Sequence, residues 1–366
     1  MTTPRLRPAA VPLLPMSRRP FSLPPRAGVA AASAVAAALL GPAGARAQDV
    51  SKAGTTAAAF LSVGVGARAM AQGGAYVAAA DDASSLYWNA AGRARMTRGE
   101  AFASHSEWLG GLRHDHLAVA MPALGGVAAV GVTSLGVPEM LVRTEDRQEG
   151  TGETFDAQDI ALALAYARAI TDRFSLGGTV KYVQQRIWNE SATGVALDIG
   201  TQFRTDFFGG LVIGASVSNF GTPMRMAGRD LRASIDPDPR ATGTNSDVPA
   251  DVATDSWEMP LTFQIGVAVR PLRSRMQQLT VSLDALHPSD NYESLNVGAE
   301  YGVRGRFFLR GGYEGLFLAE QEGGVSGGVA ARLPLPYDGG EARVDYGYRS
   351  VGRLGGAHVV SLGLTF

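Results

Sequence analysis

Alternation of apolar and polar side chains at every second position runs through most of the chain after residue 97, in segments of about ten residues. A period of two residues is that of a β-strand whose two faces meet different surroundings. No stretch after residue 47 holds 18 consecutive apolar residues, so no transmembrane helix is expected there. In a typical segment, one face carries Phe174, Leu176, Gly178, Val180 and Tyr182, and the other carries Ser175, Gly177, Thr179 and Lys181.

The series of strands predicts an all-β fold, a 14-stranded antiparallel transmembrane β-barrel over residues 98–366. The apolar faces carry Phe, Tyr and Leu, as a lipid-facing wall would, and the other faces carry charges and small residues, as a wet lumen would. A large soluble sandwich is the alternative, but the aromatic C-terminal Phe366 favours an outer-membrane barrel. We count fourteen strands, at roughly 98–107, 113–122, 126–135, 158–168, 173–186, 193–204, 208–219, 261–271, 276–287, 291–303, 305–314, 324–333, 341–350 and 356–366.

The two longest connections, 136–157 and 220–260, follow the third and the seventh strand. Both follow odd-numbered strands, so they lie at the same end, and with a periplasmic N-terminus that end is outside the cell. The second connection is acidic, with Asp236, Asp247, Asp251 and Asp255. It is either a solvated loop or a surface that contacts a secreted protein.

The first 47 residues have the pattern of an export signal. Arg18 and Arg19 precede an apolar run over 27–40, and Ala45-Arg46-Ala47 is a small-x-small cleavage site. We expect cleavage near Ala47, and Met16 is a second candidate start. Residues 1–47 hold six Arg and no acid, so the mature chain has 33 − 6 = 27 Lys and Arg against 34 Asp and Glu, a net charge of −7. That balance argues against a nucleic-acid partner.

The sequence offers little for enzymatic chemistry. It contains no Cys, which excludes thiol catalysis, disulfides and Cys-ligated zinc. Gly64-x-Gly66-x-x-Ala69 resembles a dinucleotide fingerprint but lacks the preceding strand. Ser326 sits in a Gly-x-Ser-x-Gly motif, but inside an alternating strand rather than at a strand-to-helix turn. We therefore expect no enzymatic activity and no cofactor.

Histidines and charged residues on the predicted strands each have two interpretations. His114 and His116 share a strand face near His105 and could bind zinc, although such residues more often line a lumen or rim, so no metal site is predicted. The charges on the polar faces either pair across strands, which we favour, or guide a solute. They are Lys181, Asp198, Arg204, Asp284, Arg310, Glu314, Arg343, Asp345 and Arg349.

Residues 48–97 precede the barrel and do not alternate, so we expect them to form a plug or hatch inside it. Gly73-Gly74 allows close backbone approach, and Asp81 or Asp82 can cap a short helix through Leu86 and Trp88. The expected organisation is a signal peptide at 1–47, a hatch at 48–97 and a barrel at 98–366.

This segment resembles the PorV/PorQ family of outer-membrane proteins, through Gly66-Ala67-Arg68, Gly73-Gly74-Ala75, Ala80-Asp81-Asp82-Ala83 and Asn89-Ala90-Ala91-Gly92. The first hairpin also resembles that family, through Glu107-Trp108-Leu109, Arg113-His114-Asp115 and Pro122. The match covers about 60 residues, and Ala90 stands where the family usually has Pro. The family is similar in fold to FadL-type fatty-acid transporters, which have fourteen strands and an N-terminal hatch. The hatch or gating residues on which the resemblance falls are Arg68, Gly73, Gly74, Asp81, Asp82, Asn89 and Gly92.

The resemblance implies a receptor or shuttle for exported proteins in type IX secretion, located in the outer membrane. Its partners would be membrane lipid and either secreted cargo or a sortase-like protein. The alternative is a FadL-like channel for long-chain fatty acids or other hydrophobic small molecules, and a purely structural barrel is a third interpretation. Residues expected to contact a ligand or partner near the outer loops are Trp108, Phe307, Phe308, Phe317 and Leu318.

Overall fold

The computed structural model describes residues 52–366 except 238–239, 241–246, 319–320 and 337–338. The expected signal peptide and its cleavage site near Ala47 lie outside the described residues. Among the described residues, no helix is long and apolar enough to cross a membrane.

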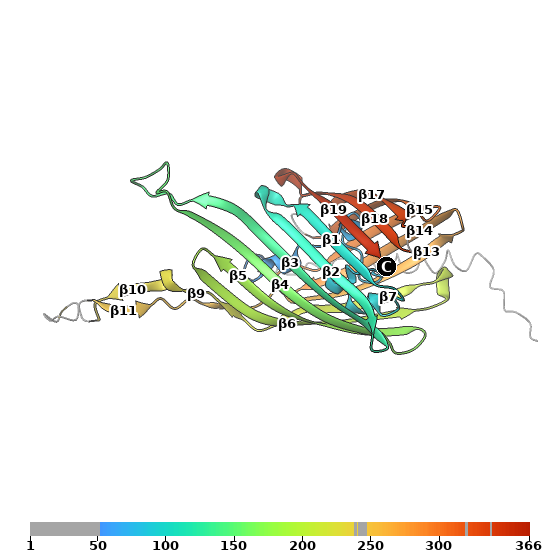
Figure 1. The fold of residues 1–366 in the computed structure, drawn as a ribbon, viewed down its shortest axis with the longest axis horizontal. Helices are drawn as coiled ribbons and strands as arrows, with labels where there is room; N and C mark the ends of the chain where they lie inside the picture. The colour runs from blue at the N-terminus through green and yellow to red at the C-terminus, as the bar shows by residue number, and fades with distance from the viewer. Residues whose placement is uncertain (1–51, 238–239, 241–246, 319–320, 337–338) are drawn as a thin grey trace, which may run out of the picture. The chain divides into compact units, whose positions relative to one another are not determined.

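Fourteen long strands form a closed antiparallel barrel, as predicted (Figure 1). Each strand pairs with the next one along the chain, and the last pairs with the first, so that Glu100 lies opposite Thr365. The strands are β1 (Glu100–Glu107), β2 (Arg113–Ala123), β3 (Gly126–Leu141), β4 (Thr154–Ala169), β5 (Phe174–Ile187), β6 (Glu190–Arg204), β7 (Val212–Gly221), β13 (Thr262–Arg273), β14 (Gln277–Pro288), β15 (Ser294–Val303), β16 (Phe307–Leu316), β17 (Val325–Pro334), β18 (Glu341–Ser350) and β19 (Gly356–Thr365).

All fourteen strands were located from the alternation, but the hairpin of β3 and β4 is longer than expected. Its ladder continues beyond a bulge between Val137 and Met140, where Met140 pairs with Phe155. Residues 138–141 are mostly exposed on both faces, so their side chains do not alternate although their backbone stays paired.

The two faces of the wall differ as the alternation predicts. Outward-facing side chains of the central barrel are large and apolar, and they include Leu117, Leu162, Leu164, Val180, Leu197, Ile199, Val329 and Leu362. Inward-facing positions are buried and mostly polar or small, and they include Ser104, Thr179, Lys181, Gln202, Ser282 and Asp345. An apolar exterior around a polar interior is the arrangement of a membrane barrel.

The two ends of the barrel are distinguished by their connections. One end, here called the loop end, carries the long connections 142–153 and 222–261 together with 108–112, 188–189, 289–293, 317–324 and 351–355. The other, the turn end, carries the connections 124–125, 170–173, 205–211, 274–276, 304–306 and 335–340, and both the start of β1 and the end of β19. Because outer-membrane barrels have long outer loops and short periplasmic turns, the loop end is the one that we expect at the cell exterior.

The connection 222–261 contains short strands of its own. They are β8 (Met224–Arg225), β9 (Ala227–Gly228), β10 (Arg232–Ile235), β11 (Val248–Asp251) and β12 (Ser256–Trp257). The β10–β11 hairpin projects beyond the barrel at the loop end (Figure 1). The same connection contains one helical turn, η5 (Arg229–Leu231). Other connections contain the single turns η3 (Leu109–Gly111), η4 (Phe207–Gly209) and η6 (Gly352–Leu354).

The segment before β1 fills the lumen, and we call residues 52–99 the plug. It contains four single turns, η1 (Ala59–Ser62), α2 (Ala67–Met70), α3 (Ser85–Trp88) and η2 (Ala90–Arg93). Its first described residues lie at the loop end, where the Ala57 amide donates to the Glu258 carbonyl at 2.8 Å. The plug then descends toward the turn end, where it joins β1 at Glu100.

Glycines on both sides let the plug backbone touch the barrel wall. A Cβ on Gly73, whose φ is +63°, would lie 2.7 Å from the backbone of Tyr313 in β16. On the wall, a Cβ would strike plug atoms at Gly131, Gly177, Gly200, Gly214, Gly266, Gly298, Gly312, Gly328 and Gly347. The close approach expected of Gly73 is therefore present, and wall glycines on nine strands complement it.

Candidate functional site: the plug and the cavity above it

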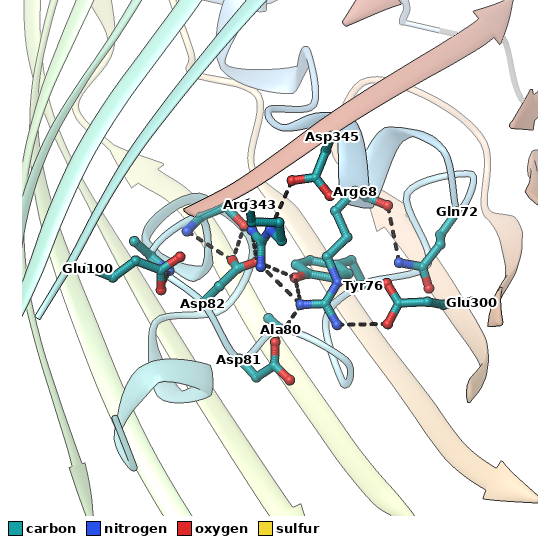
Figure 2. A network of polar contacts seen from close by, with 12 residues as sticks. Arg68, Gln72, Tyr76, Ala80, Asp81, Asp82, Glu100, Glu300, Arg343 and Asp345 are labelled. Carbon is teal, nitrogen blue, oxygen red and sulfur yellow. Dashed lines mark hydrogen bonds and ion pairs between the residues drawn. The ribbon is translucent and has the colours of Figure 1, made fainter. Parts of the chain in front are cut away.

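Arg68, in α2, links the plug to the barrel wall. Its guanidinium binds Glu300 of β15 through two hydrogen bonds, Nε to Oε2 at 2.9 Å and Nη2 to Oε1 at 3.1 Å. The same guanidinium reaches Asp81 at 2.6 Å and Asp82 at 3.3 Å. It also donates to the Tyr76 hydroxyl at 3.0 Å. Figure 2 shows these side chains converging from the plug and the wall.

A chain of ion pairs continues from Glu300 around the wall and back to the plug. Arg310 of β16 binds Glu300 at 2.8 Å and Asp345 of β18 at 2.6 Å. Arg343 binds Asp345 at 2.9 Å and returns to Asp82 at 2.7 Å. We call Arg68, Asp82, Glu300, Arg310, Arg343 and Asp345 the ion-pair network. Its three arginines match its three carboxylates, so the buried charges compensate one another.

Asp82 and its neighbour Tyr76 are held in defined protonation states. Burial acts to raise the pKa of Asp82, but Arg343 and Arg68 outweigh it and hold that pKa below its ordinary value. Burial raises the pKa of Tyr76 well above its ordinary value. Tyr76 is therefore a neutral hydroxyl, which donates to Asp82 at 3.1 Å.

The structure corrects the expected caps. Asp82 does not cap α3, whose N-cap is Ser84, with no side-chain capping bond. Instead, its Oδ1 accepts from the Ser84 amide at 3.1 Å, which closes a turn before the helix. Asp81 does not cap either, because its carboxylate is committed to Arg68.

Asn89 and Gly92 hold the turn after α3. The Asn89 side chain accepts from the Ala91 amide at 3.1 Å and so caps η2, and it donates to the Val77 carbonyl at 2.7 Å. A Cβ on Gly92 would collide with the Ala80 carbonyl. Gly74, another predicted hatch residue, takes no part in this turn. It has φ +71° and lines the cavity described next.

A cavity of about 370 Å³ lies in the lumen between the plug and the loop end. We call it the vestibule. Its floor includes Tyr87 and Trp88, whose rings meet edge to face at a centroid distance of 5.0 Å. Both rings are anchored by their polar atoms: the Trp88 Nε1 donates to the Val65 carbonyl at 3.0 Å and the Tyr87 hydroxyl to the Leu61 carbonyl at 2.9 Å. The aromatic faces are thus fixed while their polar atoms are satisfied.

The two cationic side chains that line the vestibule are already paired, and the carboxylate of Asp290 accepts a hydrogen bond from the Thr56 hydroxyl at 3.0 Å. Lys181 binds Asp198 at 2.8 Å, and Arg349 binds Glu314 at 2.9 Å. The lumenal charges therefore pair across strands here, as we favoured. Arg204 and Asp284 differ: Arg204 donates to Gln202, and Asp284 accepts from the Val77 amide at 2.8 Å.

A second cavity of about 370 Å³ lies beside the vestibule, under the connection 222–261. Its lining includes Met224, Met226 and Trp257 from that connection, and Ala192 from β6. Gly54 of the plug lines both cavities. The loop end therefore offers an apolar pocket directly next to the vestibule.

The five predicted contact residues do not form one surface. Phe307 and Phe308 begin the ten-residue strand β16 at the turn end, and Phe317 and Leu318 follow its other end, so the two pairs lie at opposite ends of the barrel. Placing all four near an outer loop was wrong. Leu318 lines the vestibule, and Phe317 is exposed on the outside. Trp108 is partly buried against Met70 and Val359, with Arg349 over its ring at 5.6 Å.

The remaining candidates for chemistry have structural roles. His105 faces outward and bonds Asp115 at 2.6 Å, on the face opposite the buried His114 and His116, so the three imidazoles do not converge. Among the described residues, no group of three or more His, Asp or Glu is arranged to hold a metal. Ser326 lies within β17 and donates to the Ala71 carbonyl at 3.2 Å.

Sequence reasoning missed Glu300 and Tyr76, which complete the surroundings of Arg68. Glu300 lies on the inner face of β15 with Asn296, and alternation along that strand could have placed it in the lumen. No comparable sequence pattern could have placed Tyr76, because apolar and polar residues do not alternate regularly in the plug.

No model of a known protein family matches the sequence, and no curated protein sequence matches it either. Solved structures do match. A FadL homologue of Pseudomonas aeruginosa is 12% identical, with 83% of this chain and 98% of that one covered at a TM-score of 0.50. The toluene transporter TbuX of Ralstonia pickettii is 11% identical, with 82% and 97% covered at a TM-score of 0.50. The chain therefore has the fold of a FadL-like outer-membrane β-barrel, with fourteen antiparallel strands around a short helical N-terminal segment.

Proposed function

We propose that the protein is an outer-membrane channel for small hydrophobic or amphipathic molecules, and that the vestibule is its binding site. The observation that carries this proposal is the cavity of about 370 Å³ above the plug, with an anchored aromatic floor. Ligand sites for small molecules are concave, mostly preformed and within this range of volume. The likeness in fold to a FadL homologue and to a toluene transporter supports it.

The lining of the vestibule indicates what kind of solute it suits. Tyr87, Trp88, Leu61 and Leu286 offer apolar contact. The two cations at the rim, Lys181 and Arg349, are neutralised by their own carboxylates, and amide groups such as Asn296 add hydrogen-bonding positions. An uncharged molecule with an apolar body and one polar group fits this lining better than an anion does, because an anion would have to displace Asp198 or Glu314 from its cation.

The adjoining apolar pocket under the connection 222–261 suits the first contact of such a molecule from outside. Met224 and Met226 are unbranched and adapt to varied shapes. From there a solute would pass Gly54 into the vestibule, and the plug closes the route beyond it. Passage across the barrel then requires the plug to move, which is the gating role proposed for Arg68, Asp81 and Asp82.

A receptor or shuttle role in type IX secretion rests on the motif resemblance over about 60 residues alone, from Gly66 to Pro122. A cavity of small-molecule size is not what a surface for folded protein cargo requires. The transport function is therefore the one we propose.

The test is binding of a solute panel to the purified full chain: toluene, an uncharged long-chain alcohol and an alkyl carboxylate. Trp88→Ala should weaken binding of the best solute by about tenfold, since a lost aromatic contact is worth about 1–2 kcal/mol. Trp188→Ala is the matched control, because Trp188 lies in an exposed connection outside the vestibule. Equal affinities in the two variants, or no binding of any solute, would refute the proposal.

A further inference from the structure

The turn end of the barrel carries unpaired arginines along one arc of its rim. Arg273 and Arg275 lie at the connection between β13 and β14, and Arg304 and Arg306 lie at that between β15 and β16. All four side chains are exposed. In the part of the chain that the structure describes, no ion pair joins any of the four to a carboxylate.

These arginines form one continuous surface because their turns are bonded together. The Arg304 amide donates to the Met276 carbonyl at 2.8 Å, which joins the two turns. The Arg332 amide donates to the Arg306 carbonyl at 2.7 Å, which joins the second turn to β17. Arg332 itself pairs with Glu341 at 3.6 Å. We call Arg273, Arg275, Arg304 and Arg306 the arginine arc.

The arc is not a consequence of overall composition. The mature chain has a net charge of −7 by count, from 27 basic and 34 acidic residues. The connection 142–153 at the opposite end is acidic, with Glu145, Asp146, Glu149 and Glu153 against Arg143 and Arg147. Positive charge is thus concentrated at the turn end, where a matching anion would be attracted.

The arc borders the apolar exterior of the barrel. Phe307 and Leu309 on β16 are 62% and 61% exposed, and Met276 and Leu333 are 52% and 54% exposed. Large apolar side chains at this exposure face lipid tails, so the arginines next to them lie at the level of the lipid headgroups. Guanidinium groups bind phosphate oxygens with two parallel hydrogen bonds.

We propose that the arginine arc binds the phosphate groups of anionic phospholipids in the leaflet at the turn end, in preference to zwitterionic ones. The continuity of the arc with the lipid-facing wall favours a lipid over an acidic soluble protein, which would have to bind against the membrane surface. The bound lipids form a fixed anionic patch beside β13–β17.

The experiment is native mass spectrometry of the purified full chain with phosphatidylglycerol, cardiolipin or phosphatidylethanolamine added one at a time. Wild-type protein should retain the two anionic lipids over phosphatidylethanolamine, and added salt should weaken that retention. Arg275→Gln with Arg304→Gln should lower the affinity for the anionic lipids by at least about tenfold, since each surface arginine contributes roughly fivefold.

The matched control is Arg143→Gln with Arg147→Gln, which removes the same charge from exposed positions at the loop end. This control should bind like the wild type. Heat-dependent mobility on a gel establishes that both variants are folded barrels. Equal retention of anionic and zwitterionic lipid, equal loss in the two variants, or capture of an acidic protein with no lipid preference would each overturn the proposal.

Discussion

Replacing Gly73 by Ala should loosen the plug without unfolding the barrel. A Cβ at this position would lie 2.7 Å from the amide nitrogen and carbonyl carbon of Tyr313, in the wall strand β16. Ordinary contacts of a Cβ begin near 3.4 Å, so the plug must move away from β16 by roughly 0.7 Å. The neighbouring atoms are backbone within a paired strand, and they cannot yield as a flexible side chain would.

Overpacking of this kind costs about 1–3 kcal/mol. Because 1.4 kcal/mol corresponds to a factor of ten, the fraction of molecules with the plug released should rise about five- to 150-fold. Amide hydrogen exchange reports such local opening directly. We expect faster exchange in residues 66–78 by that factor, and unchanged exchange in the wall strands.

The control is Gly110→Ala. Gly110 has φ +68°, close to the +63° of Gly73, but a Cβ there would meet nothing within 4 Å. Both variants therefore carry the strain of a left-handed alanine, and only Gly73→Ala adds the collision. If the two variants show the same exchange in the plug, the close approach to β16 does not hold the plug in place and the reasoning fails.

Two further substitutions test the polar side of the plug by hydrogen exchange and thermal unfolding. Asp82→Asn removes one of the three carboxylates that balance the three arginines of the ion-pair network. One buried positive charge is then uncompensated, so plug stability should fall by about 3–5 kcal/mol. The pKa of Asp82 is lower in the folded protein than in the unfolded chain, so its contribution to plug stability is complete above the unfolded pKa of about 4 and is lost as the pH falls further. Amide exchange in the wild-type plug should therefore rise below about pH 4. Asp82→Asn should abolish that rise. Arg93 is fully buried, and none of its three side-chain nitrogens has a hydrogen-bond partner among the described residues. Burial lowers its pKa to about 10, so Arg93→Met should raise the midpoint of thermal unfolding. A lowered midpoint would show that a water or an ion satisfies the guanidinium.

The strands were predictable because each has two different environments, lipid on one side and a filled lumen on the other. Alternation fails where this difference disappears, as in residues 138–141, which extend beyond the wall. The wrong placement of Phe307 together with Phe317 near one outer loop has another origin. Both are aromatic residues near strand ends, but Phe307 begins β16 and Phe317 follows its last residue, so the strand places them at opposite ends of the barrel.

The sequence predicted that the plug lies inside the barrel, but it did not predict which wall residues the plug contacts. Gly73-Gly74 signals close approach without naming the partner, and the partner, Tyr313, is far away in the sequence. The pair of Arg68 with Glu300 depends on which wall strand lies beside α2 once the plug is seated in the closed barrel. That relation is set by the register of all fourteen strands together, and no local pattern carries it.

The plug is held by different forces on its two sides, and this decides how it can move. Toward β1–β6 its contacts include apolar clusters, with Leu86 against Phe102 and Val127, and Phe60 against Val183. Toward β14–β18 it is held by the ion-pair network and by Asp284, whereas backbone contact at glycines occurs on both sides. Water can replace polar contacts at small net cost, whereas separating apolar surfaces costs free energy in proportion to the area exposed. Release should therefore begin at β14–β18, with the apolar side as the hinge, and the ion-pair network sets the barrier to opening.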